Sequence, residues 1–119
     1  FLTFLSFFAI LNIVTVVYAL REKKGMIHYM NFIYNQNQIS CYDPNGKLLA
    51  EVTFPDTDAH TVAINHTFVD ESLRGQGVAG QLMEAAANHL RSQNKKAVLT
   101  CSYAVKWFEK HPEYDDVVK

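Results

Sequence analysis

The chain has 119 residues, 49% of them hydrophobic, and a formal net charge of −1 at neutral pH. This length suits one domain of modest size, and the near-zero charge gives no indication of nucleic-acid binding. The two cysteines, Cys41 and Cys101, make no disulfide framework, and no Cys/His cluster has the spacing of a zinc site. The simplest expectation is a reduced, cytoplasmic protein that binds no metal.

The first 20 residues differ from the rest of the chain because they carry no charge. Such a run is long enough to cross a bilayer as a helix, and the basic residues directly after it favour a cytoplasmic C-terminal side. Alternatively, translation begins at Met26 or Met30, and the apolar run is a translated upstream region. Residues 1–25 are therefore a membrane anchor or a mis-assigned start, with a membrane partner only in the first case. The functional domain is expected at residues 30–119 in both cases.

Short strands joined by polar turns are predicted in the first half of this domain. Alternating apolar and polar residues place them at 31–34, 38–42, 47–54 and 60–69. The segments between the last three, at 43–46 and 55–58, have the composition of turns. In the fourth strand, Val62, Ile64, His66 and Phe68 are expected to share one face. These features predict an antiparallel meander.

A glycine-rich segment after the fourth strand is the most informative part of the chain. Apolar residues at helical spacing follow Gly77 and predict a helix that continues to about Ser92. No Ser, Thr, Asp or Asn stands directly before Gly75 to cap the first N–H groups of that helix. Free amides, a helix dipole and the charge of Arg74 together predict an anion site, most naturally for phosphate. The candidate binding residues are Phe68, Val69, Arg74, Gly75, Gln76, Gly77, Val78, Ala79 and Gly80.

The same glycines match the dinucleotide fingerprint G-x-G-x-x-G, but their setting excludes that function. Residues 70–74 separate the first glycine from the strand, and no acidic residue stands about 20 positions further on. Too little chain remains for two βαβ halves. A Walker P-loop is excluded as well, because no Gly-Lys-Ser/Thr follows.

A fifth strand at 97–101 and a last helix at 103–111, stopped by Pro112, complete the predicted elements. A strand–helix–strand crossover of this length favours parallel pairing with a right-handed connection. Ligands bind outside the C-terminal ends of parallel strands in open sheets. We therefore expect His66 and Cys101 to border one crevice beside the phosphate loop.

The spacing Arg/Gln-x-x-Gly-x-Gly/Ala, present here as Arg74, Gly77 and Ala79, resembles the acetyl-CoA pyrophosphate loop of the GNAT superfamily of N-acetyltransferases. Segments 101–103 and 111–114 are similar to a small single-domain subgroup, the YjdJ type. The resemblance covers most of the chain and implies a compact α/β fold with a mixed sheet, in the order β-β-β-β-α-β-α. It also implies transfer of an acetyl group from acetyl-CoA to an amine, whether of a protein or of a small molecule.

The resemblance further implies a base, a proton donor and an oxyanion site. An imidazole has an ordinary pKa of roughly 6.5, so His66 is the candidate base, while backbone amides at 66–68 would polarise the thioester oxygen. GNAT enzymes take their proton donor from a tyrosine of the last helix, but Phe108 stands at that position. Either Cys101 or Tyr103 would then protonate the CoA thiolate, or Cys101 would act as a nucleophile activated by His66.

Two alternatives to an acetyltransferase stay open. The loss of the tyrosine at position 108 favours a CoA-binding or sensing module without turnover. A membrane-anchored interaction domain, in which the glycine loop is purely structural, is the third interpretation and requires that residues 1–20 are translated.

Overall fold

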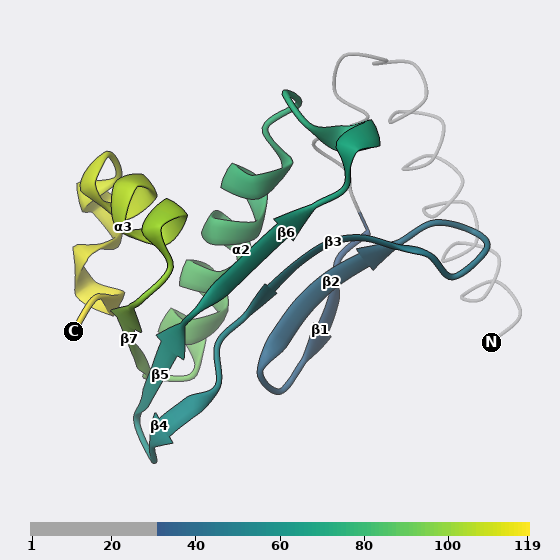
Figure 1. The fold of residues 1–119 in the computed structure, drawn as a ribbon. Helices are drawn as coiled ribbons and strands as arrows, with labels where there is room; N and C mark the ends of the chain where they lie inside the picture. The colour runs from purple at the N-terminus through teal and green to yellow at the C-terminus, as the bar shows by residue number, and fades with distance from the viewer. Residues whose placement is uncertain (1–30) are drawn as a thin grey trace, which may run out of the picture. The chain divides into compact units, whose positions relative to one another are not determined.

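The computed structural model describes residues 31–119, which are drawn in colour in Figure 1. The strands are β1 (Ile33–Asn35), β2 (Gln38–Tyr42), β3 (Leu48–Thr53), β4 (Asp56–Asp58), β5 (Thr61–Ile64), β6 (His66–Val69) and β7 (Lys96–Leu99). The helices are α2 (Val78–Ser92) and α3 (Ser102–Glu109), with 3₁₀ turns η2 (Glu71–Leu73) and η3 (Pro112–Val117). The predicted anchor or start-site segment, residues 1–25, lies outside the described residues. Within residues 31–119, no helix is long and apolar enough to span a bilayer.

The strands form two sheets that meet where β5 continues into β6. One sheet has the order β1-β2-β3-β6 and is antiparallel throughout, and the other has the order β4-β5-β7. β5 and β7 run parallel, with Val62 opposite Ala97 and Ile64 opposite Leu99. The predicted meander and the predicted parallel crossover are both confirmed. Figure 1 shows α2 behind the sheets and α3, with the C-terminal segment, beside β7.

The single strand predicted at 60–69 is in fact two strands that belong to different sheets. Asn65 and His66 both oppose Thr53, since the Asn65 N–H donates to Thr53 O (3.3 Å) and His66 is the register partner of Thr53. Such an extra residue is a β-bulge, which bends the strand and reverses the alternation of its side chains. The expectation that His66 shares a face with Ile64 is therefore wrong: Ile64 is fully buried and His66 is exposed.

Further boundaries differ from the prediction, including those of β1 and β7, which span Ile33–Asn35 and Lys96–Leu99. The expected turn at 55–58 contains β4, which pairs with β5 as a short edge strand. The expected helix at 103–111 ends at Glu109, and the chain then continues through Pro112 into η3. Proline without an N–H suits the first position of a helical turn, so Pro112 ends one helix and begins the next turn.

The core lies between α2 and the face of the sheets that it covers. The buried side chains of α2 recur at helical spacing and are Val78, Leu82, Met83, Ala86, Ala87 and Leu90. On the sheet side they face Ala50 and Val52 of β3 and Phe54, which follows β3. These three side chains are fully buried as well. Burying each large aliphatic side chain contributes about 1.5–3 kcal/mol, which makes this contact the main support of the helix. At the far end of α2, Arg91 binds both carboxylate oxygens of Asp116 in η3 (2.6 and 2.8 Å).

Candidate functional site

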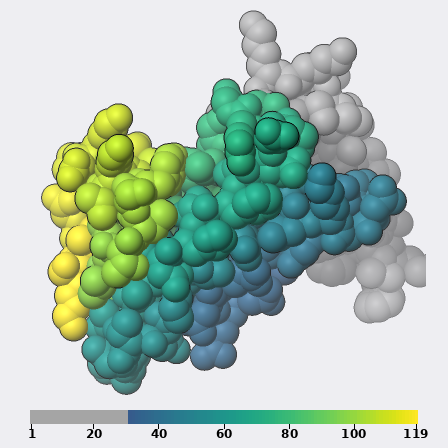
Figure 2. Space-filling model, in the orientation of Figure 1, coloured from purple at the N-terminus to yellow at the C-terminus, as the bar shows by residue number. Residues whose placement is uncertain are grey.

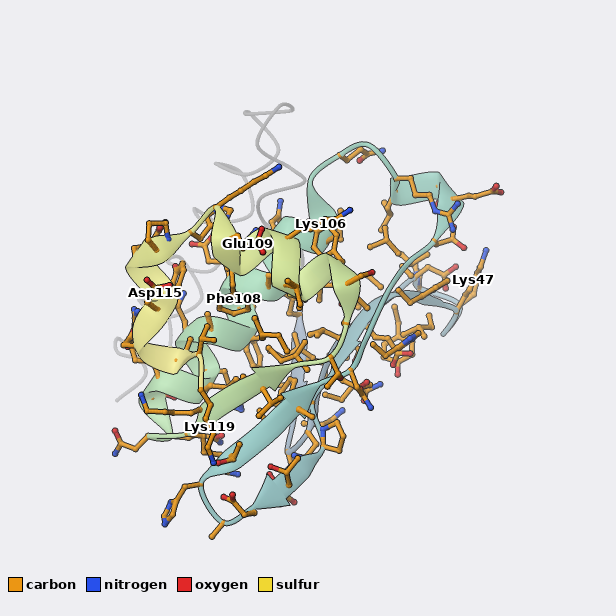
Figure 3. The ribbon with its side chains drawn as sticks, turned by 60° about the vertical axis from the view of Figure 1, so that its left-hand side comes forward. Lys47, Lys106, Phe108, Glu109, Asp115 and Lys119 are labelled. Atoms are coloured by element: carbon orange, nitrogen blue, oxygen red, sulfur yellow. The ribbon has the colours of Figure 1, made fainter. Side chains whose placement is uncertain are left out.

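The loop between β6 and α2 is held in place from its base. The Asp70 carboxylate accepts hydrogen bonds from the N–H and hydroxyl of Ser72 (3.1 and 2.6 Å) and so caps η2. Lys47 Nζ lies 3.4 Å from the same carboxylate, and Figure 3 shows Lys47 at the edge of the molecule near this loop. These contacts lower the pKa of Asp70, first through the Ser72 hydroxyl and then through the Ser72 N–H and Lys47.

The N-terminus of α2 is open. Gly77 occupies the N-cap position with φ of 78° and supplies no side-chain cap, as the sequence predicts. The first N–H groups of a helix have no acceptor within the helix, so they are available to a ligand. A Cβ placed on Gly75 (φ 80°) or Gly77 would meet no heavy atom within 4 Å, which leaves room over this backbone. Positive φ at two nearby glycines explains why glycine stands at both positions.

Arg74 joins this loop to the end of β6. Its Nε donates to the carbonyl of Val69 (3.2 Å), and no carboxylate of residues 31–119 lies within ion-pair distance of its guanidinium. In the same loop, Gln76 Nε2 donates to Ser72 O (3.2 Å). An arginine held in this way, next to free helix amides, forms the kind of site that binds phosphate groups.

A pocket of about 230 Å³ connects the loop with the last helix. Its walls come from the end of β6, from the loop and first turn of α2, and from α3, and they are formed by Val69, Leu73, Arg74, Gly75, Gly77, Val78, Ala79 and Tyr103. The space-filling view shows a notch between the teal loop and the yellow-green C-terminal segment (Figure 2). The pocket thus unites most of the predicted binding residues with one predicted catalytic residue, Tyr103. Partial burial raises the pKa of the Tyr103 phenol above its ordinary value.

Gly80 stands one turn into α2 and serves a different purpose from Gly75 and Gly77. A Cβ at this position would lie 3.4 Å from Trp107 Nε1 and 3.8 Å from the Tyr103 hydroxyl. These are ordinary van der Waals distances, and they place Trp107 and Tyr103 of α3 directly against the start of α2.

The backbone N–H and C=O groups at the end of β6 alternate in direction, toward β3 and away from it. The Asp70 N–H donates to Leu49 O (2.7 Å), and hydrogen-bonded pairs alternate along an antiparallel ladder. It follows that Phe68 directs its backbone groups to β3, whereas Thr67 and Val69 direct theirs away from β3. Since β7 pairs with β5 and not with β6, the side of β6 that carries the Thr67 and Val69 amides has no strand partner. The amides free to meet a ligand are thus those of Thr67 and Val69, not that of Phe68.

Cys101 lies where β7 ends and α3 begins, beside β6. Its N–H donates to Ile64 O (3.0 Å), and its Sγ lies 3.7 Å from Thr67 Oγ1. Thr67 was not among the residues predicted from the sequence, because only the bulge at Asn65 turns its side chain to this face. The available signal was weak, because Thr67 is one of several polar residues in the stretch 60–69.

His66 lies on the opposite face of the sheet from Thr67, since neighbouring side chains of a strand alternate. Its Nε2 lies 3.3 Å from Glu51 Oε2, and its side chain is 53% exposed. The structure therefore does not bring the His66 ring and the Cys101 thiol onto one face, as the sequence analysis expected. Instead the two residues flank the β6 strand from its two sides.

Phe108, at the position of the usual tyrosine, belongs to the core. It is 3% exposed and packs edge-on against Trp107, with ring centroids 5.0 Å apart. Figure 3 labels it in α3. Trp107 in turn stacks on His111 at 3.8 Å. Phe108 thus gives no proton donor, and Tyr103 is the phenol that α3 presents to the pocket.

The donor set suits a phosphate-containing ligand. Free helix amides, a positive side chain and an open glycine backbone meet at one pocket, so the residues fit the pyrophosphate of CoA. Within residues 31–119, no three side chains of the metal-binding types come together as a metal site.

Comparison with known proteins identifies the family and the fold. Residues 38–117 match the model of the GCN5-related N-acetyl-transferase family. The solution structure of a GCN5-like protein from Staphylococcus aureus is 33% identical, has a TM-score of 0.64, and is matched over 76% of this chain and 88% of its own. This similarity confirms the predicted fold class.

Two vertebrate relatives share a shorter segment. Protein NATD1 of Xenopus tropicalis is 38% identical over 52 residues, which cover 44% of this chain and 48% of that protein. Protein NATD1 of Danio rerio is 39% identical over 56 residues, or 45% and 51% of the two chains. The matched part thus spans about half the length of these curated relatives, and membership of the YjdJ-type subgroup stays a prediction. The match across residues 38–117 shows that the chain belongs to the GCN5-related N-acetyltransferase family.

Proposed function

We propose that this protein is an acetyl-CoA-dependent N-acetyltransferase that acts on a primary amine. The observation that carries the proposal is the pocket in which the Arg74–Ala79 loop, the uncapped start of α2 and Tyr103 converge. The loop amides and Arg74 would hold the pyrophosphate. The remainder of acetyl-CoA would run along the unpaired edge of β6, past the Val69 and Thr67 amides.

The reaction forms one bond and breaks one. The neutral amine nitrogen attacks the thioester carbonyl carbon, and the C–S bond breaks to release the CoA thiolate. A β6 amide stabilises the oxygen that carries negative charge in between. His66 takes the proton that the amine loses, and the thiolate gains a proton from Tyr103 or Cys101. The products are an N-acetylated amine and CoA.

Tyr103 is the better placed of the two proton donors. It lines the pocket together with the loop. Cys101 lies deeper, beside Thr67, where a thiol could also take up the acetyl group before the amine does. In that second route the thiolate of Cys101 attacks first, and the amine then displaces it.

A second function is supported by one observation. Phe108 is buried in the place where GNAT enzymes have their tyrosine, and this substitution fits a module that binds CoA without turning it over. The two functions differ in a single measurable property, the transfer of acetyl to an amine.

The test is a calorimetric titration of the full chain with acetyl-CoA and with CoA, followed by an assay of a panel of amines. Micromolar binding with acetylation of any amine supports the transferase. Binding of both ligands without acetylation of any member favours the sensing module. If neither ligand binds, both proposals fail, and the glycine loop is an ordinary helix start.

A further inference from the structure

The face of the antiparallel sheet opposite α2 carries a polar chain that the mechanism above does not use. Gln38 of β2, Glu51 of β3 and His66 of β6 come from three neighbouring strands. Gln38 and His66 are both register partners of Thr53, next to Glu51, so the three side chains project from the same face. Their proximity is thus a property of the strand register and not of loop conformation.

Each oxygen of the Glu51 carboxylate has its own partner. Gln38 Nε2 donates to Oε1 (2.7 Å), and His66 Nε2 lies 3.3 Å from Oε2. The Glu51 side chain is only 17% exposed, whereas that of His66 is 53% exposed. A shielded carboxylate that is anchored on one side can orient an accessible imidazole on the other side and favour one of its tautomers. A proton on Nε2 would face Oε2 of Glu51 at 3.3 Å, and Nδ1 would then be left as the free base.

This arrangement places His66 at the edge of the acetyl-CoA site but on the other face of β6. Thr67, the next residue, turns its side chain to Cys101, and its backbone groups lie on the unpaired edge of the strand. An amine that reached His66 Nδ1 would therefore arrive from the face opposite α2, while acetyl-CoA occupies the pocket at the start of α2. The two substrates would meet at the unpaired edge of β6.

We propose that Glu51, held by Gln38, is a positioning residue that orients His66 as the base for an amine approaching from the face of the sheet opposite α2. This inference rests on the proposed function. It assigns Glu51 and Gln38 no contact with the reacting atoms. Their effect on turnover passes through the ring of His66.

The first test requires no acceptor. Long-range ¹H–¹⁵N spectra of the full chain report which nitrogen of each neutral imidazole carries the proton, and a His66→Gln variant identifies the His66 signals. We expect the Nε2–H tautomer in the wild type and a loss of that preference in Glu51→Gln. The matched control is Glu113→Gln, an exposed carboxylate of η3, which should leave the spectrum of His66 unchanged. Equal His66 spectra in the wild type and Glu51→Gln would overturn the proposal.

The second test uses any amine that the panel identifies. Glu51→Gln should lower kcat roughly tenfold, a fraction of the usual contribution of a general base, with the KM for acetyl-CoA unchanged. A Glu51→Gln/His66→Ala double variant should be no slower than His66→Ala alone, because Glu51 acts only through His66. Additive losses would contradict this role. If the wild-type chain binds no acetyl-CoA, the proposed function is refuted. If it binds acetyl-CoA but the His66 signals are the same in Glu51→Gln as in the wild type, only the present inference is refuted.

Discussion

Thr67 Oγ1 lies 3.7 Å from Cys101 Sγ, across the point where β6 leaves the parallel pair of β5 and β7. The contact joins residues 34 positions apart in sequence and exists because the Asn65 bulge turns Thr67 to this face. A hydroxyl beside a thiol can share a hydrogen bond with its sulfur. The reactivity of Cys101 should therefore depend on Thr67.

Replacement of Thr67 by valine, which has the same shape but no hydroxyl, tests this dependence. Losing one hydrogen bond of about 0.5–1.5 kcal/mol to the thiolate should slow alkylation of Cys101 by iodoacetamide roughly 2- to 10-fold. The control is Thr57→Val, which removes a hydroxyl from the β4 edge strand. An alkylation rate equal to that of the wild type would reduce the contact to packing.

Much of the fold follows from local patterns in the sequence. The α2 helix has four-residue spacing of apolar side chains, and its buried set agrees with that spacing. The strand at Gln38–Tyr42 has the predicted bounds, and the alternation that predicted a strand at 47–54 appears in β3 as buried Ala50 and Val52 between half-buried neighbours. Periodicity works here because each element buries one side against the same core.

The bulge at Asn65 could not be foreseen, and it changes the site. An alternating pattern shows a strand, but nothing in it reveals that two residues share one partner on a neighbouring strand. Because of the bulge, His66 lies on the face opposite Cys101, and Thr67 lies beside Cys101 in its place. The contact of Glu51 with His66 likewise depends on the strand register, which the sequence does not state. By contrast, the loop at Arg74–Ala79 was visible because glycine and arginine spacing is local.

Gly77 and Gly46 offer a matched pair for testing the glycine loop. Both have positive φ (78° and 87°) and space for a Cβ, so alanine at either should cost about 1–2 kcal/mol of folding stability through backbone strain alone. Only Gly77→Ala adds a methyl group to the proposed phosphate cradle. We expect similar losses in urea unfolding, with weaker acetyl-CoA binding for Gly77→Ala only. Equal affinities of the two variants would contradict the placement of the phosphate.

Arg74→Ala tests the charged contact of that cradle. Loss of a charge-assisted hydrogen bond to pyrophosphate should weaken acetyl-CoA binding by about 1–3 kcal/mol, measured by calorimetry. The control is Lys95→Ala, which removes a cation just beyond the other end of α2, where Lys95 pairs with Asp56. Unchanged affinity in Arg74→Ala, or an equal loss in Lys95→Ala, would count against the assignment.

The Asp70 cap of η2 predicts a pH dependence. The folded protein lowers the pKa of Asp70 below its ordinary value, mainly through the Ser72 hydroxyl and N–H and further through Lys47. A carboxyl with a lowered folded pKa stabilises the fold above its unfolded pKa and loses this contribution as the pH falls through the folded value. In thermal unfolding at pH 6, the Tm of Asp70→Asn should be lower than that of the wild type. This difference in Tm should shrink toward pH 2. A constant difference over this range would show that the carboxylate charge is not the cause.

Tyr103 and Cys101 compete for the role of proton donor, and two small substitutions separate them. Tyr103→Phe keeps the ring that lines the pocket but removes the proton. If Tyr103 protonates the CoA thiolate, this variant should lose roughly 100-fold in kcat while acetyl-CoA affinity stays within about twofold, since general acid catalysis is worth about 10²–10⁴-fold. Tyr42→Phe, at an exposed tyrosine of β2, is the control.

Cys101→Ala gives the complementary result. If Cys101 carries the acetyl group, Cys101→Ala should be the slower variant, and rapid-quench mass spectrometry of the wild type should detect a chain heavier by one acetyl group. If Cys101 only packs beside Thr67, Cys101→Ala should keep the wild-type rate, and no acetylated chain should accumulate. Tyr103 lines the pocket, whereas Cys101 lies beside β6. The loss of kcat in Tyr103→Phe is therefore expected to be larger than that in Cys101→Ala. The opposite order would assign the chemistry to the thiol.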